Sequence, residues 1–373
     1  MRARLWRWVL CALLAGAVLP LLPAGTPHAA AAGVVTVRWG YYVTYAADSL
    51  VSLKANVDSL THVAPYYYAL KTDGTIDTKN EQPATTALLR DHHVKVVPMI
   101  KNGPTYNDFH NLIDTPQEQD RLVAALVALV TSKGYDGINI DFEGLNPTDR
   151  PLLTDFMRRL HAQLSAAGKL TTMAVPAKAT DTTTGWGGAY DYAALAPSLD
   201  YVVVMAYDFH YAGGTPGPVA PVNWVRGVAR YAAAQFGAGK TILGVPFYGL
   251  DWDTKTKQPA STVKMDGGPP LAQRPNATSG YSTTDAANWV KYTDDHGDPH
   301  EAWYESEQSI TAKLGVVTDL GLAGFGAWRL GQEDGGAWNA IHRLDTPATR
   351  VPPVANTATQ HYFPETGQVV QGA

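Results

Sequence analysis

The chain has 373 residues, of which 45% are hydrophobic and 17% are charged, and its formal net charge is −5. This length and composition suit one large globular domain or two ordinary ones. An acidic chain without runs of lysine or arginine does not have the charge pattern of a nucleic-acid-binding protein.

The N-terminus has the composition of a secretory signal peptide. Arginines within the first seven residues precede an apolar run, Trp8–Leu22, and small residues follow at positions 29–32. Because prolines interrupt the run and it is short for a membrane span, we predict that residues 1–32 are a cleaved signal peptide. The mature protein is then expected to be secreted, free of the membrane and monomeric. It would lose three arginines, no acids and the only cysteine, Cys11, so its net charge becomes −8 and it has no disulfide.

Eight short apolar segments with strand character follow, separated by longer stretches. They are Val34–Tyr42, Leu60–Tyr68, Val94–Ile100, Gly137–Phe142, Leu170–Val175, Tyr201–Ala206, Thr241–Phe247 and Ala323–Trp328. Amphipathic helical patterns lie between them at Gln117–Lys133, Asp149–Ala167, Val222–Phe236 and Ser306–Leu320. This alternation favours parallel pairing. A closed barrel of this kind needs about 250 residues, so we predict an α/β fold, a (β/α)8 TIM barrel, over residues 33–344. An open doubly wound sheet is the alternative, although no glycine-rich phosphate turn follows the first strand.

Two segments do not fit a plain barrel. Residues 251–305, after the seventh strand, are rich in Gly, Pro, Ser and Thr and longer than one helix requires. We predict a small loop-rich α+β insertion there, between strand 7 and helix 7, with a strand pair around Trp289–Tyr292 and Glu301–Tyr304. Residues 345–373 begin as a Pro/Thr-rich linker and continue as a tail whose role stays open.

The segment GYDGINIDFEG, at positions 134–144, has polar residues where a barrel strand faces inward. Apolar residues at 138, 140 and 142 alternate with Asn139, Asp141 and Glu143. Since successive strand side chains point to opposite faces, the polar set is expected inside the barrel. Active sites of such barrels lie at the C-terminal ends of the strands, so Glu143 is the candidate reacting acid and Asp141 lies one layer below. Crowded carboxyl groups in a dry interior have raised pKa values, as a general acid requires. A hydrogen-bonded polar ladder and a site for a hard cation are the alternatives.

Four motifs, in order and at barrel-strand spacing, resemble glycoside hydrolase family 18. Asp136 to Glu143 resembles the family signature Asp-x-x-Asp-x-Asp-x-Glu, and the others are VMAYD at 204–208, GVPFYGLDW at 244–252 and GFGAWRLGQED at 324–334. The resemblance covers residues 40–344. One departure is Asn139, where family chitinases usually have Asp. Together with HEAWYESEQSITAKL at 300–314, this departure resembles the branch of spore-cortex and peptidoglycan hydrolases.

The resemblance implies a glycosidase that cleaves β-1,4 linkages of N-acetylglucosamine-containing polymers, chitin or peptidoglycan. Family 18 enzymes retain the anomeric configuration by using the substrate's own acetamido group. Glu143 would act first as the acid and then as the base. Asp141 would orient the acetamido N–H, and Tyr207 would hydrogen-bond the acetamido oxygen. No metal and no cofactor are implied.

The same motifs suggest residues that bind the sugar. Asn139 and Asp208 would contact or support it, and Trp328 would form the apolar floor beneath the ring. Tyr41 and Tyr248 are candidates for stacking, with core packing as the alternative, and the remaining motif residue, Asp136, would support the start of its strand. A non-catalytic chitin- or peptidoglycan-binding lectin-like barrel is the alternative function. A metal-dependent barrel hydrolase is a third hypothesis, although no His-rich ligand set accompanies the acids.

Overall fold

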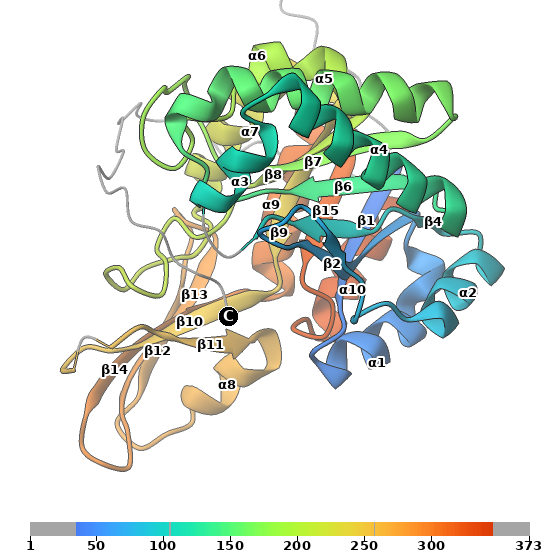
Figure 1. Ribbon diagram of the computed structural model, residues 1–373. Helices are drawn as coiled ribbons and strands as arrows, with labels where there is room; N and C mark the ends of the chain where they lie inside the picture. The colour runs from blue at the N-terminus through green and yellow to red at the C-terminus, as the bar shows by residue number, and fades with distance from the viewer. Residues whose placement is uncertain (1–34, 104–105, 257, 346–373) are drawn as a thin grey trace, which may run out of the picture. The chain divides into compact units, whose positions relative to one another are not determined.

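The computed structural model describes residues 35–103, 106–256 and 258–345 (Figure 1). The predicted signal peptide, residues 1–32, and the tail beyond residue 345 lie outside this part of the chain. None of the helices that the structure describes is long and apolar enough to cross a membrane.

The central sheet closes on itself through parallel pairs. The order around it is β1-β2-β5-β6-β7-β8-β9-β15, and β15 pairs with β1 again. The strands are β1 (Val37–Val43), β2 (His62–Leu70), β4 (Lys95–Val96), β5 (Met99–Lys101), β6 (Gly137–Asp141), β7 (Leu170–Pro176), β8 (Tyr201–Met205), β9 (Thr241–Pro246) and β15 (Gly324–Trp328). This ring of parallel strands confirms the predicted TIM barrel.

Helices alternate with the barrel strands along the chain (Figure 1). They are α1 (Ala47–Asn56), α2 (Pro83–Asp91), α3 (Tyr106–Ile113), α4 (Pro116–Lys133), α5 (Arg150–Ala166), α6 (Tyr192–Leu195), α7 (Val222–Phe236), α9 (Glu307–Asp319) and α10 (Gly335–His342). Their buried faces and the outward side chains of the barrel strands form one large hydrophobic core. A second cluster, which includes Trp39, Tyr41 and Met99, fills the barrel interior.

The third barrel strand, predicted as one continuous segment, is divided into two in the structure. Two short strands, β4 and β5, stand in place of Val94–Ile100, and they are separated by Val97 and Pro98. Proline has no N–H to donate to a neighbouring strand, so the ladder is interrupted there. Both pieces still pair with β2, which also carries the two-residue antiparallel strand β3 (Ile76–Asp77).

The insertion after the seventh barrel strand is a five-stranded antiparallel sheet, more regular than predicted. Its order is β11-β10-β14-β13-β12. The strands are β10 (Tyr248–Asp253), β11 (Ser261–Lys264), β12 (Thr278–Ser282), β13 (Ala287–Thr293) and β14 (Pro299–Tyr304), with the short helix α8 (Gly268–Leu271) between β11 and β12. The predicted pair is β13 and β14, which do pair with each other. The structure adds three strands that the sequence did not indicate.

Glycines before and within the acid-bearing strand make its position possible. Gly134 ends α4 in the left-handed conformation, with φ of 66°, which is the usual role of glycine after a helix. Gly137 begins β6 so close to β7 that a Cβ atom would lie 2.4 Å from the Leu170 carbonyl oxygen. A larger residue at 137 would therefore push β6, and the acids at its end, away from the neighbouring strand.

Candidate active site

The inward face of β6 carries a polar ladder inside the barrel. Asn139 is fully buried, where its Oδ1 accepts a hydrogen bond from the Tyr41 hydroxyl at 3.2 Å and its Nδ2 donates to Thr172 Oγ1 at 3.0 Å. On the opposite face, Phe142 packs against Phe109 of α3, with ring centroids 4.6 Å apart. The alternation thus orients the strand as its pattern predicts, with apolar residues toward the helices and polar ones inside.

Asp141 and Glu143 follow at the C-terminal end of β6. Asp141 is buried and is the last residue of the strand, whereas Glu143 lies two residues further on and is partly exposed. Asn102 Oδ1 accepts a hydrogen bond from the Glu143 N–H at 3.0 Å, and Asn102 Nδ2 donates to the Glu143 carbonyl at 2.8 Å. The hydroxyl of Tyr190 donates to the carbonyl of Phe142. The backbone that carries Glu143 is therefore held from two sides.

Burial and like charge both keep protons on these acids. Burial raises the pKa of Asp141 to about 7, against a smaller opposing effect of the Lys101 ammonium. The pKa of Glu143 is raised well above its ordinary value, first by burial and then by the negative charges of Asp141 and Asp208. Two neighbouring carboxyl groups that are largely shielded from water cannot both ionise easily, so the pair retains a proton at neutral pH. That is the state a general acid needs.

Aromatic side chains from several strands lie close to the acids at the barrel mouth. Trp328, at the end of β15, meets Tyr41 of β1 edge-on, with centroids 5.3 Å apart. Tyr207, after β8, meets Tyr248 of β10 at 6.2 Å. Tyr207 and Trp328 are both partly exposed and both contact the hydrophobic cluster that includes Tyr248. The barrel mouth therefore brings aromatic rings close to carboxyl groups, and sugar-binding sites combine these two kinds of group.

Asp208, which follows β8 at the barrel mouth, has a constrained backbone conformation. Its φ is 59°, in the left-handed region that residues other than glycine seldom adopt. The residue is exposed, yet its carboxylate accepts a hydrogen bond from the Tyr248 hydroxyl. Partial removal from water raises the pKa of Asp208, and the bond from Tyr248 opposes that rise. Strain of this kind is concentrated at functional sites.

Asp136 is the one predicted site residue that lies apart from the barrel mouth, because it precedes β6. Its Oδ2 accepts a hydrogen bond from the Val96 N–H at 2.8 Å, and so ties the approach to β6 to the neighbouring β4. The remaining predicted residues come together at the barrel mouth or directly below it. They are Tyr41, Asn139, Asp141, Glu143, Tyr207, Asp208, Tyr248 and Trp328.

Three residues of the site have no sequence motif that marks them. Lys101 and Asn102 follow each other at the end of β5, and Tyr190 lies in the loop before α6. A polar residue directly after a barrel strand is a usable signal, because that position always faces the mouth. Tyr190 offers no such signal, since only the folded chain brings it to Phe142.

Among the residues that the structure describes, no group of three or more His, Cys, Asp or Glu side chains is arranged to hold a metal ion. Asp208 instead accepts a hydrogen bond from the Tyr248 hydroxyl, and Tyr41 and Tyr207 lie near Asp141 and Glu143. Proton transfer through Glu143 is the chemistry that such surroundings support directly.

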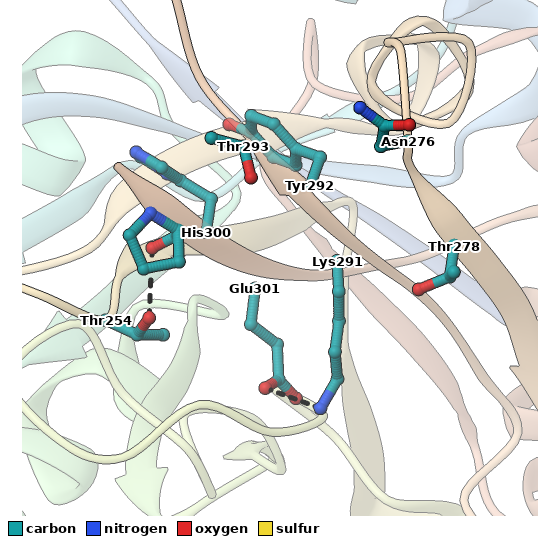
Figure 2. Close-up of a pocket in the computed structure, with 9 residues that line it drawn as sticks. Thr254, Asn276, Thr278, Lys291, Tyr292, Thr293, His300 and Glu301 are labelled. Atoms are coloured by element: carbon teal, nitrogen blue, oxygen red, sulfur yellow. Dashed lines mark hydrogen bonds and ion pairs between the residues drawn. The ribbon is translucent and has the colours of Figure 1, made fainter. Parts of the chain in front are cut away.

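A separate cavity of about 500 Å³ lies on the insertion sheet and is lined by insertion residues alone (Figure 2). Four of its side chains make close contacts with one another or with Arg274. The ring of Tyr292 stacks on His300 at 5.0 Å and has the guanidinium of Arg274 5.0 Å from its centroid. Lys291 and Glu301 form a cross-strand ion pair at 3.0 Å, drawn as a dashed line in Figure 2. These contacts stabilise the insertion and occupy the Tyr292 ring.

Comparisons with known proteins give a family model, relatives and solved structures that this chain resembles. The family model described as glycosyl hydrolases family 18 matches residues 37–333. YdhD of Bacillus subtilis (strain 168), which carries the name of a sporulation-specific glycosylase, is 38% identical over 224 residues, or 59% of this chain and 53% of YdhD. The cortical fragment-lytic enzyme of Bacillus cereus is 29% identical over 296 residues, or 76% of this chain and 68% of that enzyme. The crystal structure of a chitinase from Chromobacterium violaceum has a TM-score of 0.78 at 25% identity, over 84% of this chain and 100% of that chain. The chain thus spans about half the length of YdhD.

Proposed function

This chain belongs to family 18 of the glycosyl hydrolases, and from that membership we propose that it cleaves β-1,4 linkages beside N-acetylglucosamine in chitin or peptidoglycan. The reaction retains the anomeric configuration and is assisted by the substrate. The proposal draws on the membership, on the acids and aromatic rings at the barrel mouth and on relatives named as cortex-lytic enzymes and chitinases.

Glu143 supplies the proton in the first step. Its raised pKa keeps the carboxyl group protonated until a glycosidic oxygen lies beside it, and the proton then passes to the leaving sugar. The substrate's acetamido oxygen attacks the anomeric carbon and closes an oxazolinium ring. Glu143, now ionised, takes a proton from the water that opens this ring and returns to its starting state.

The neighbours of Glu143 position the acetamido group. Asp141 accepts a hydrogen bond from the acetamido N–H and stabilises the positive charge that develops on the ring. Tyr207 donates to the acetamido oxygen, and Trp328 packs beneath the sugar. Asn139 supports this layer from below through Tyr41 and Thr172, while Asp208 and Tyr248 contact the sugar at the rim.

One observation carries the proposal: a partly exposed carboxyl group with a raised pKa, at the C-terminal end of a barrel strand, directly above a second buried acid. The test is Glu143→Gln assayed on N-acetylglucosamine oligomers and on purified peptidoglycan. We expect kcat to fall by about 10²–10⁴-fold, with binding of the oligomers retained. The anomer released first by the parent protein, followed by proton NMR, is expected to be β.

Other results would reject this assignment. Unchanged turnover by Glu143→Gln would remove Glu143 from the reaction. A parent protein that binds these glycans but never cleaves them would instead favour the lectin-like alternative. Release of the α anomer first would exclude assistance by the acetamido group.

Secretion is part of the same proposal, because both polymers lie outside the cytoplasm. It depends on the arginine-led apolar segment within residues 1–32. N-terminal sequencing of protein recovered from the medium or the cell wall is expected to start near residue 33. Recovery with Met1 intact would contradict it.

A further inference from the structure

We propose that the barrel mouth contains, beside the two acids, a subsite for an N-acetylated sugar that bears a carboxylate, formed by Lys101, Tyr66, Tyr45 and Arg329. This inference rests on the proposed function and narrows its substrate to an anionic glycan of the peptidoglycan type. The shared chemistry is the carboxylate, whether it belongs to a lactyl group on the sugar or to a stem peptide.

The four residues lie on consecutive positions around the barrel mouth. Arg329 follows β15, Tyr45 follows β1, Tyr66 is in β2, and Lys101 ends β5. Lys101 is the register partner of Asp141 on the next strand. Paired residues of neighbouring parallel strands point to the same face, about 4.8 Å apart at the backbone. The cation therefore emerges at the same level of the mouth as the buried acid.

Lys101 forms no close ion pair in the part of the chain that the structure describes, although Asp141 and Glu143 lie near enough for its charge to lower their pKa values. Its side chain is exposed, and its Nζ lies 5.4 Å from the centre of the Tyr66 ring. Arg329 differs, because its Nη1 pairs with Asp48 Oδ1 at 3.1 Å. Lys101 is thus the charge that remains available for an anionic ligand, while Arg329 lies 5.7 Å from the centre of the Tyr45 ring.

Tyr45 and Tyr66 provide the apolar part of the subsite. Tyr45 is 59% exposed, unusual for so large a side chain, and it meets the Tyr66 ring edge-on at 6.2 Å. Each ring has a cation over it, from Arg329 or from Lys101. Flat sugar faces pack on exposed rings, and adjacent cations orient the anionic substituents.

With a neutral substrate, the Lys101 ammonium group would have no opposite charge on the ligand to pair with, and it would still favour loss of the proton from the acids. The ammonium group lowers the pKa of both Asp141 and Glu143, against the burial that raises them, and so works against proton retention. A substrate carboxylate that pairs with Lys101 would neutralise this effect when the substrate is bound. The acid would then hold its proton most firmly in the complex, where the proton is needed.

The test compares substrates that differ in whether, and where, they bear a carboxylate. They are peptidoglycan glycan strands freed of stem peptides, the same strands with their lactyl carboxylates converted to amides, and strands that keep their stem peptides. The variants are Lys101→Met, Lys101→Arg to restore the charge, and Lys95→Met as the matched control, an exposed lysine at the other end of the same barrel strand.

We expect Lys101→Met to lower kcat/KM by about tenfold on the carboxylate-bearing strands and by less than about twofold on the amidated strands. Lys101→Arg should recover most of the loss, and Lys95→Met should match the parent.

A loss confined to strands with stem peptides would assign the carboxylate to the peptide, and a loss on the freed strands would assign it to the lactyl group. Equal losses on charged and amidated strands would overturn the subsite. If the parent cleaves none of these strands but does cleave chitin oligomers, the subsite falls and the proposed glycosidase stands. If it cleaves neither, the proposed function falls.

Discussion

Asn102 contacts both main-chain hydrogen-bonding groups of Glu143, at 3.0 Å to its N–H and 2.8 Å to its carbonyl. The two residues follow neighbouring barrel strands, so this pair of bonds joins the end of β5 to the segment after β6 that carries the acid. The side chain of Glu143 is thereby positioned through its backbone, and its carboxyl group takes no part in these two bonds.

Replacing Asn102 by Ala is expected to misplace the acid without removing it. Small displacements of a reacting group reduce rates strongly, so kcat should fall by about 10²-fold, while KM changes little. The measurement is steady-state kinetics on N-acetylglucosamine oligomers, with circular dichroism to check the fold. Asn146→Ala is the matched control, because Asn146 lies in the loop after Glu143 and bonds Thr148 instead. Parental kcat in Asn102→Ala would show that these bonds do not position the acid.

Much of the barrel could be predicted because its determinants are local. Each barrel strand has its own apolar run, the helices α4, α5, α7 and α9 have their own amphipathic patterns, and the alternation around Asp141 fixes which face enters the barrel. The four motifs then fix the order of strands around the cleft. Only Pro98 misled the prediction of a strand, since it divides the third one into two.

The insertion could not be predicted to the same depth, because its order comes from pairing between distant segments. Residues 278–282 include a glycine and little hydrophobic content, yet they form β12 by pairing with β13. The strand β10 begins at Tyr248, one residue after the seventh barrel strand, so the sequence shows one extended run where the structure has two strands. The contact of Tyr190 with Phe142 spans 48 residues and has no local pattern for the same reason.

Because the pKa values of Asp141 and Glu143 are raised in the folded protein, its free energy of unfolding should fall as pH rises. Asp141 and Glu143 bind protons more tightly in the folded chain, so their contribution is fully present below the unfolded pKa and is lost as pH rises through the folded one, about 7 for Asp141. Glu143→Gln carries no charge to desolvate, so we expect it to be more stable than the parent by about 1–2 kcal/mol near pH 8. Thermal unfolding of both proteins between about pH 4 and pH 8 tests this. A constant difference across that range would contradict it.

Tyr248→Phe should move the pH dependence of the reaction. The Tyr248 hydroxyl lowers the pKa of Asp208, so its loss raises that pKa and keeps Asp208 neutral to higher pH. The negative charge of Asp208 is one cause of the raised pKa of Glu143, so Glu143 would then lose its proton at lower pH. We expect the basic limb of the kcat/KM profile to move down by about half a pH unit. Tyr292→Phe, in the insertion, serves as control, and an unmoved basic limb in Tyr248→Phe would exclude this coupling.

A buried ion pair connects the insertion to the barrel. Lys313 of α9 lies 2.7 Å from Glu305, which follows β14, and both side chains are almost fully buried. Lys313→Met would leave the Glu305 charge without its partner, so we expect a loss of about 3–5 kcal/mol in the free energy of unfolding. Adding Glu305→Leu should recover much of this loss, since removing both charges is often close to neutral. Arg343→Met breaks an exposed pair with Glu307, and should cost less than about 1 kcal/mol. Equal losses for Lys313→Met and Arg343→Met in urea unfolding would show that the buried pair does not hold the insertion in place.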